Sequence, residues 1–149
     1  MRVGEICTVE TIYCKRDETV QGAAALMRKH HVGDLVVVDR VDSTAIPVGI
    51  VTDRDIVVSV IALALDPASM LVGDIMSDDL LTCHEDDDVY QTIEHMRLRG
   101  IRRVPVVNHA GALTGIVSVD DLLEFLADEM GDLSRISGSG QAHEKRARH

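Results

Sequence analysis

The stretch Gly49-Ile50-Val51-Thr52-Asp53-Arg54-Asp55-Ile56 decides the fold because it occurs twice. Its second copy is Gly115-Ile116-Val117-Ser118-Val119-Asp120-Asp121-Leu122. In each copy an apolar, β-branched run ends in a hydroxyl residue, and an acid follows three positions later. This pattern predicts a strand that passes directly into a helix, with the hydroxyl residue as the helix N-cap. A doubled junction of this kind indicates a chain built from two copies of one unit.

The repetition extends over most of the chain. Val3-Gly4-Glu5-Ile6 returns as Val72-Gly73-Asp74-Ile75, and Cys14 returns as Cys83 at the same offset of 69 residues. The offset shortens to 66 at the doubled junction because the first copy has a longer preceding loop. We therefore predict two repeats, residues 1–68 and 69–133.

Each repeat has the same predicted order of elements. Apolar residues at helical spacing predict helices that begin at Val20 and Val89 and end in a cluster of cations, the second at Gly100. Two β-branched runs follow in each copy, at 35–38 and 48–51 and at 104–107 and 113–117, and predict hairpins. The connection 40–46 is longer and more polar than the turn 108–111. Final helices are predicted from Asp53 to about residue 65 and from Val119 to about residue 130, the second ending at Gly131.

The fold class is therefore α/β (α+β), with two β-α-β-β-α units. Three strands and two helices bury too little area to be stable alone, so the two units are expected to pack face to face around a pseudo-twofold axis. Residues 134–149 contain Ser137-Gly138-Ser139-Gly140, followed by the cations Lys145, Arg146 and Arg148, and few apolar groups. We predict a mobile C-terminal tail there.

Composition excludes several classes of function. The chain of 149 residues has 25 acidic and 15 basic side chains, a formal net charge of −10, which argues against nucleic acid or an anionic membrane as the partner. Its sequence has no apolar run long enough to cross a bilayer and no signal-peptide pattern, so a cytoplasmic location is expected. Three cysteines, Cys7, Cys14 and Cys83, lack metal-like spacing and are expected to be buried free thiols.

The two motif copies, each preceded by an α-β unit that ends in a Val-rich strand, resemble the cystathionine β-synthase (CBS) domain family. Two such units in tandem resemble a Bateman module, and the resemblance covers about residues 3–126. It implies a regulatory module without catalysis of its own, often a homodimer, that binds an adenosyl compound between its repeats. The ligands implied are AMP, ADP, ATP, and possibly NAD(H) or S-adenosylmethionine, with no required cofactor.

The hydroxyl and the acid of each motif have two interpretations. The spacing fits a capping box, in which the side chains of Thr52 and Asp55, and of Ser118 and Asp121, satisfy backbone groups at a helix start. A carboxylate fixed there is also able to accept two hydrogen bonds from a ribose diol. The resemblance implies this ribose-binding role for both acids with their hydroxyl partners.

The resemblance also implies an apolar slot for the base, formed by the strand that enters each repeat and the first hairpin strand. For each of these residues the alternative is ordinary core packing. Tyr13 is distinctive because its ring is able to stack on adenine, whereas Thr82 in the second copy is not. The candidates are Ile12, Tyr13, Leu81, Thr82, Val36, Ile50, Pro105 and Ile116.

Phosphate would need positive charge, and the candidates are Arg102, Arg103 and Arg54. Because successive side chains on a strand point to opposite faces, only one of Arg102 and Arg103 is expected to face the site unless the strand is irregular there. The first copy has Gly33 and Asp34 at those positions. We therefore predict that the site using the second copy's arginines binds phosphorylated ligands better, while which arginine serves which acid stays open.

No catalytic constellation or metal site is predicted. His30 and His31 lie at adjacent positions near a helix end and point apart, and the acidic run 85–88 precedes a helix start, where acid is electrostatically favoured. The alternative to ligand sensing is a constitutive protein-interaction scaffold. In either case we expect a homodimer through the helices 56–65 and 122–130, with apolar residues such as Val60, Leu63, Phe125 and Met130, and an unknown effector protein.

Overall fold

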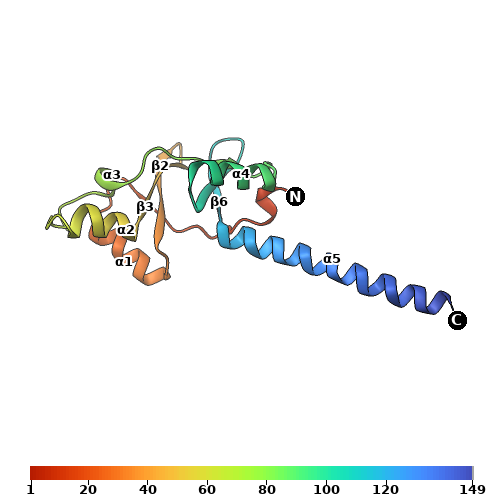
Figure 1. The fold of residues 1–149 in the computed structure, drawn as a ribbon. Coiled ribbons are helices and arrows are strands. Elements are labelled where there is room, and N and C mark those ends of the chain that lie inside the picture. The colour runs from red at the N-terminus through yellow and green to blue at the C-terminus, as the bar shows by residue number, and fades with distance from the viewer. Residues whose placement is uncertain (149) are drawn as a thin grey trace.

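A computed structural model describes residues 1–148 and contains two three-stranded sheets with their helices (Figure 1). In each sheet the first two strands are parallel and the last two are antiparallel. The sheets have the same register, with Cys14 opposite Val37 and Cys83 opposite Val106. The elements are η1 (Val3–Glu5), β1 (Tyr13–Lys15), α1 (Val20–His30), β2 (Asp34–Val41), β3 (Thr44–Thr52), α2 (Asp53–Ile56), η2 (Val57–Ile61), α3 (Val72–Ile75), β4 (Cys83–His84), α4 (Val89–Arg99), β5 (Arg103–Val107), β6 (Leu113–Ser118) and α5 (Val119–Ala147). The predicted α/β class and the repeated β-α-β-β-α order are confirmed.

The helices α1 and α4 begin and end as the sequence predicts. Thr19 caps α1 by accepting a hydrogen bond from the Gly22 amide, and Asp88 caps α4. Gly100 ends α4 in the left-handed conformation with φ of 63°, which glycine adopts without steric cost. The cations of both final turns lie where the helix dipole favours positive charge.

Each sheet buries one face under the helices of its own repeat and turns its opposite face toward the other repeat. Leu35 and Val37 of β2 belong to the first core, whereas Val36 on the opposite face is also buried, with 1% of its surface exposed. Strand β3 contacts β6, so the two sheets meet along their hairpins. The region between the sheets therefore lies at the pseudo-twofold axis.

The leading segments of the two repeats, residues 1–8 and 70–77, are exchanged. Val3 is fully buried in the core of the second repeat, and Val72 is fully buried in the core of the first. Backbone hydrogen bonds hold both segments in place, including Val3 N to Asp87 O at 2.9 Å and Val72 N to Glu18 O at 2.8 Å. The boundaries between the packed units therefore differ from the boundaries of the sequence repeats.

The prediction of a long connection over residues 40–46 is wrong. Strands β2 and β3 continue until Val41 lies opposite Thr44, which leaves the two-residue turn Asp42-Ser43. Both turn residues have positive φ, 50° and 66°, as a tight hairpin turn of the type I′ class requires. Polar composition alone did not distinguish this turn from an open loop, because Asp tolerates the left-handed region and Ser adopts it here.

The final helix of the first repeat is shorter than predicted. After one turn of α2 the chain widens into the π-helix η2, in which the Ala62 amide bonds to the Val57 carbonyl at 2.8 Å. The chain then leaves the helix and Ala64 adopts a positive φ of 55°. The run of β-branched residues Val57, Val58 and Val60 is a poor helix former, which fits this early end before residue 65.

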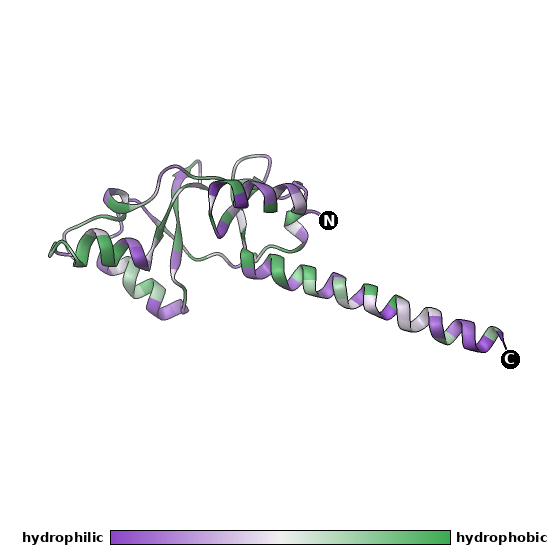
Figure 2. Ribbon diagram, viewed as in Figure 1, coloured by the Kyte–Doolittle hydropathy of each residue, from purple (hydrophilic) through white to green (hydrophobic). Residues whose placement is uncertain are grey.

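The final helix of the second repeat is longer than predicted, because α5 passes through Gly131 and reaches Ala147. Residues 134–147, predicted as a tail, are therefore helical in this structure. Figure 1 shows α5 extending away from both sheets, and Figure 2 shows that its last turns are more hydrophilic than its first. No helix within residues 1–148 combines the length and the apolar character that a bilayer crossing needs.

Candidate functional site: a cleft between the repeats

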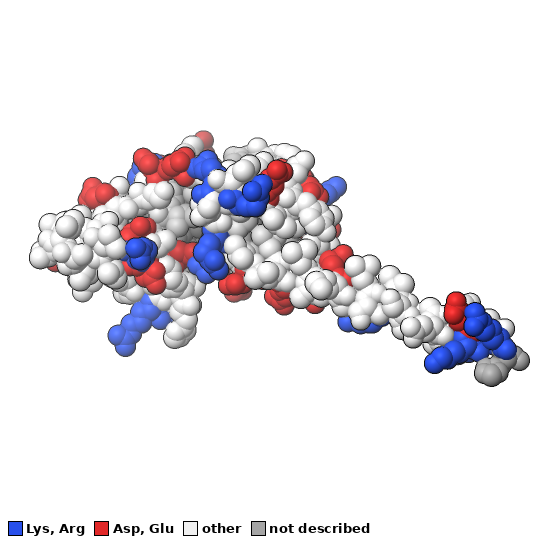
Figure 3. All heavy atoms as spheres, in the orientation of Figure 1, with Lys and Arg blue, Asp and Glu red and all other residues white. Residues whose placement is uncertain are grey.

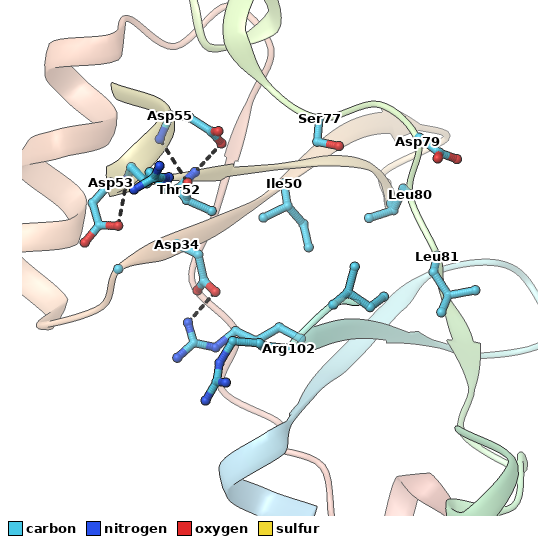
Figure 4. Close-up of a pocket in the computed structure, with 14 residues that line it drawn as sticks. Asp34, Ile50, Thr52, Asp53, Asp55, Ser77, Asp79, Leu80, Leu81 and Arg102 are labelled. Atoms are coloured by element: carbon cyan, nitrogen blue, oxygen red, sulfur yellow. Dashed lines mark hydrogen bonds and ion pairs between the residues drawn. The ribbon is translucent and has the colours of Figure 1, made fainter. Parts of the chain in front are cut away.

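A cleft of about 520 Å³ lies between the two repeats (Figure 4). One wall comes from β3 and α2, another from the chain between α3 and β4, and a third from the start of β5. We call it the Asp55 cleft. It is lined by Gly33, Asp34, Ile50, Thr52, Asp53, Arg54, Asp55, Ser77, Asp79, Leu80, Leu81, Ile101, Arg102 and Arg103.

Thr52 and Asp55 form the predicted capping box at the mouth of α2. The Asp55 amide donates to Thr52 Oγ1 at 3.0 Å, and the Thr52 amide donates to Asp55 Oδ2 at 2.9 Å. These bonds fix the carboxylate at a helix start and occupy one of its two oxygens. Asp55 Oδ1 makes no hydrogen bond within residues 1–148, so it is available to a hydroxyl donor in the cleft.

All three predicted phosphate-binding arginines line this one cleft. Sequence alternation predicted that only one of Arg102 and Arg103 faces the site unless the strand is irregular there. Both line the cleft, because β5 begins only at Arg103 and Arg102 lies in the bend before it. Arg103 is paired with Asp34, whose side chain is 15% exposed. These two residues occupy equivalent positions of the two repeats, so their ion pair spans the pseudo-twofold axis. Arg102 has no side-chain partner in the described part of the chain.

The cleft is electrostatically mixed rather than strongly positive. Three arginines lie among four aspartates, and the pair of Arg103 with Asp34 removes one charge of each sign. Figure 3 shows acidic and basic side chains interspersed over the body of the molecule and a group of mainly basic side chains at the far end of α5. A ligand with several negative charges would therefore meet opposing carboxylates as well as arginines.

An apolar surface faces the charged groups across the cleft. Ile50 and Leu81 were predicted to contact a base, and both line the cleft. Leu80 and Ile101 complete this surface and were not predicted. The other lining residues that were not predicted are Gly33 and the polar residues Asp34, Asp53, Ser77 and Asp79. Leu80 and Ser77 could have been placed at the cleft only by knowing that the leading segments are exchanged. The Ile50 amide donates to the Ser77 carbonyl at 3.1 Å and so holds this stretch beside β3.

The equivalent capping box of the second repeat lies outside the Asp55 cleft. Ser118 N donates to Asp121 Oδ2 at 2.8 Å, and Asp121 N donates to Ser118 Oγ at 3.1 Å. The local geometry matches that of Thr52 and Asp55. A ribose-binding role for Asp121 and Ser118 stays a prediction.

The remaining predicted residues also lie outside the cleft lining. Tyr13 is 40% exposed, and its hydroxyl accepts a hydrogen bond from Arg40 at 3.1 Å rather than facing the Asp55 cleft. Val36 is buried between strands, and Pro105 is its buried equivalent in β5. Ile12 and Thr82 immediately precede β1 and β4 and are half-buried and exposed, respectively, and Ile116 is half-buried in β6.

The cysteines are thiols in or beside the cores. Cys14 and Cys83 are buried and Cys7 is half-buried, so the prediction of buried free thiols is confirmed for two of the three. Burial raises the pKa of Cys14 to about 11 and the pKa of Cys83 to about 12, because a thiolate loses its hydration there. At neutral pH both are therefore protonated and act as small apolar side chains.

Two exchanged repeats with a cleft between them define a tandem α/β module. The family model for the CBS domain matches residues 3–61 and 72–128, and the chain belongs to the CBS domain family. Protein MK0525 of Methanopyrus kandleri is 37% identical over 122 residues, which is 82% of this chain and 61% of that protein. The chain thus spans about three fifths of that relative's length.

Solved structures of CBS domain proteins have the same fold. The CBS domain pair of protein MJ0100, in complex with 5′-methylthioadenosine and S-adenosyl-L-methionine, has a TM-score of 0.72 and 28% identity and covers 87% of this chain and 98% of its own. CBS domain protein PAE2072 from Pyrobaculum aerophilum, complexed with AMP, has a TM-score of 0.73 and 30% identity. That match covers 82% of this chain and 90% of the PAE2072 chain.

Proposed function

We propose that the chain is a regulatory module, not an enzyme, that binds an adenosyl ligand in the Asp55 cleft and transmits its occupancy through dimer packing. The observation that carries this proposal is the position of Asp55, whose carboxylate is fixed by a capping box at a cleft with an apolar surface. Arg102 lines the same cleft, and its guanidinium has no side-chain partner within residues 1–148. The volume of about 520 Å³ lies in the range of small-molecule sites. The adenosyl ligands of MJ0100 and PAE2072 support the same ligand class.

The charge of the cleft suggests an order of ligands. With four aspartates beside three arginines, each further phosphate adds repulsion that Arg102 and Arg54 only partly offset. We expect AMP or the cationic S-adenosylmethionine to bind more tightly than ADP, and ADP more tightly than ATP. NADH belongs in the same comparison as a larger adenosyl compound.

Calorimetric titration of the full chain with these five compounds tests the proposal. Asp55→Asn keeps an oxygen that accepts the Thr52 amide but removes the charge, so it should weaken binding of the best ligand at least about tenfold. Asp121→Asn is the matched control, because it makes the same change in an identical capping box outside this cleft. An affinity of Asp55→Asn equal to that of the wild type would contradict the assignment of Asp55.

The dimer proposal rests on exposed apolar side chains. Val60 and Phe125, two of the predicted contact residues, are buried in the cores and are not available, which corrects that prediction. Leu63 and Met130 are 65% and 71% exposed, and η2 adds Val57 and Ile61, each 56% exposed. The exposed apolar side chains Val57, Ile61 and Leu63 lie close together in sequence in and just after η2, and such a concentration of exposed apolar groups favours a protein contact.

Light scattering and small-angle X-ray scattering with and without AMP test the relay. We expect a dimer whose shape changes on ligand addition, and a shift toward monomer in Ile61→Asp. Identical scattering with and without bound AMP would contradict the relay. Absence of heat with every ligand, together with a stable dimer, would favour the scaffold function in place of sensing.

A further inference from the structure

Three potential metal ligands meet at the end of the second sheet, away from the Asp55 cleft. His84 comes from β4, Asp86 from the turn before α4, and His109 from the β5–β6 turn. One ligand atom of each lies within 4.8 Å of the others, and His109 Nε2 is 3.0 Å from Asp86 Oδ2. The two imidazole rings lie 4.3 Å apart at 45°. We call these residues the histidine cluster.

The geometry points to a binding site for one divalent transition-metal ion of borderline softness, and we propose Zn²⁺. Zinc binds imidazole nitrogen at about 2.0–2.1 Å and carboxylate oxygen at about 2.0–2.2 Å, so two ligand atoms of one ion lie roughly 3.4 Å apart. Side-chain rotations are enough to bring the cluster to that spacing, since the His109 side chain is 81% exposed and that of Asp86 is 47% exposed. Two nitrogens and one oxygen leave a fourth position for water.

The surroundings of the cluster suit a cation. Asp87 and Glu85 flank Asp86 in sequence and add negative charge, and the Asp87 carboxylate accepts the His84 amide at 2.7 Å, which fixes the backbone of one ligand. Arg2 contacts the other carboxylate oxygen, Asp86 Oδ1, at 3.3 Å. An ion at Oδ2 therefore leaves the Arg2 contact in place.

The first repeat provides an internal comparison. At the offset of 69 residues, the equivalents of His84, Asp86 and His109 are Lys15, Asp17 and Arg40. These three residues also lie together, because they line one shallow depression at the same end of the first sheet. The fold thus brings these positions together in both repeats, but only the second repeat has histidines there, and the first has Lys15 and Arg40 beside Asp17. The sequence pattern does not reveal the cluster, because His84 and His109 are 25 residues apart and meet only when the hairpin forms.

A bound ion would add a side-chain link between three segments whose backbones are already joined by the pairing of β4 with β5. Through Asp86 it would also reinforce the N-terminal segment, which Arg2 links to the same carboxylate. Ligation stabilises the folded state because the site does not exist in the unfolded chain. We therefore expect the melting temperature to rise with zinc concentration.

Titration of the tag-free full chain with ZnCl₂, by calorimetry and thermal unfolding, tests the proposal. We expect one ion per chain and no response to MgCl₂. His109→Gln, His84→Gln and Asp86→Asn should each weaken zinc binding at least about tenfold. His30→Gln is the control, because it removes an exposed histidine from the consecutive pair His30 and His31, which lies outside the histidine cluster. This variant should bind zinc like the wild type.

The internal comparison allows a gain-of-site experiment. Lys15→His combined with Arg40→His places two imidazoles beside Asp17, and we expect the stoichiometry to rise from one ion to two. We claim that two imidazoles and one carboxylate at these positions suffice to bind zinc. This claim would be overturned if the doubly substituted protein has a native circular dichroism spectrum and still binds only one ion. Absence of zinc binding by the wild type, or zinc affinities of the three cluster variants that equal that of the wild type, would overturn the proposed site itself.

Discussion

Asp34 shows how one side chain sets the charge of a shared cleft. It is the first-repeat equivalent of Arg103, and the two form an ion pair across the pseudo-twofold axis. An arginine paired in this way has less positive potential to offer to a phosphate. The preference of the cleft among nucleotides therefore depends on a residue that does not need to touch the ligand.

Asp34→Asn should release Arg103 and remove one negative charge from the cleft. We expect the affinity for ATP to increase by about tenfold relative to that for AMP, since one charge interaction at the protein surface changes the binding free energy by roughly 1 kcal/mol or more. Calorimetry with both nucleotides measures the ratio. Asp79→Asn, which removes an exposed carboxylate of the same cleft that pairs with Arg99 instead, is the comparison. An unchanged ratio in Asp34→Asn would contradict this account.

The capping boxes illustrate what could be predicted residue by residue. The spacing of Thr52 with Asp55 and of Ser118 with Asp121 predicted both boxes, because the hydrogen bonds are local and need only three residues. The association of Asp55 with Arg102 and Arg103 could not be predicted. It depends on how one repeat lies against the other, and nothing in the spacing of either motif encodes that arrangement.

At the scale of elements, the strands β3 and β6 are each met by a crossing segment at a glycine. A Cβ atom on Gly49 would lie 2.6 Å from the Ser77 carbonyl oxygen, and one on Gly115 would lie 2.8 Å from the Thr8 carbonyl oxygen. Both distances are shorter than a van der Waals contact. These glycines therefore permit the backbone bonds between Ile50 and Ser77 and between Thr8 and Ile116.

Gly49→Ala should destabilise the protein by about 1–3 kcal/mol, because the methyl group displaces the crossing segment that forms one wall of the Asp55 cleft. Urea unfolding followed by circular dichroism measures the change, and weaker ligand binding should accompany it. Gly138→Ala is the control, because nothing lies within 4 Å of that position and the helix α5 should gain about 0.5–1 kcal/mol in local stability. Equal unfolding midpoints for the wild type and Gly49→Ala would argue against a tight crossing.

The elements also show where sequence patterns lose their value. Helices α1 and α4 were predicted because their apolar periodicity is completed by caps at both ends. Helix α5 continues through Gly131, Gly138 and Gly140, residues that favour a helix end in sequence without requiring one. The turn Asp42-Ser43 depends on two positive φ angles, which composition does not reveal.

At the scale of the whole molecule, the two cores are similar and each contains one buried thiol, Cys14 or Cys83. The pKa of each thiol is raised by burial from a usual value near 9, to about 11 and about 12. Below pH 8 or so the thiols are protonated in both states and do not affect stability. As pH rises past about 9 the unfolded chain loses these protons while the folded chain retains them, so the free energy of unfolding should fall.

Urea unfolding at several pH values between about 8 and 10.5 tests this prediction. The double substitution Cys14→Ala with Cys83→Ala should show a smaller decrease with pH than the wild type, whatever its absolute stability. Other groups that titrate in this range are the same in both proteins and cancel in the comparison. Parallel curves would show that the thiols ionise equally in the two states.

The exchange of leading segments predicts that each segment stabilises the opposite repeat. Val3→Ala and Val72→Ala each remove two methyl groups from a fully buried position and should cost about 2 kcal/mol. Hydrogen exchange should increase in β5 and β6 for Val3→Ala, and in β2 and β3 for Val72→Ala. The two variants are controls for each other, and faster exchange in the repeat nearest in sequence would contradict the exchanged packing.

The same exchange determines the order in which the chain is able to fold as a ribosome releases it. The first repeat is completed as soon as residues 70–77 have emerged, because its core needs only Val72 and its neighbours in addition to what came before. Residues 1–8 must instead wait for β5 and β6, about one hundred residues later, before Val3 reaches its place. This segment is thus made well before the strands on which it docks, so its docking is a late step in the folding of the pair.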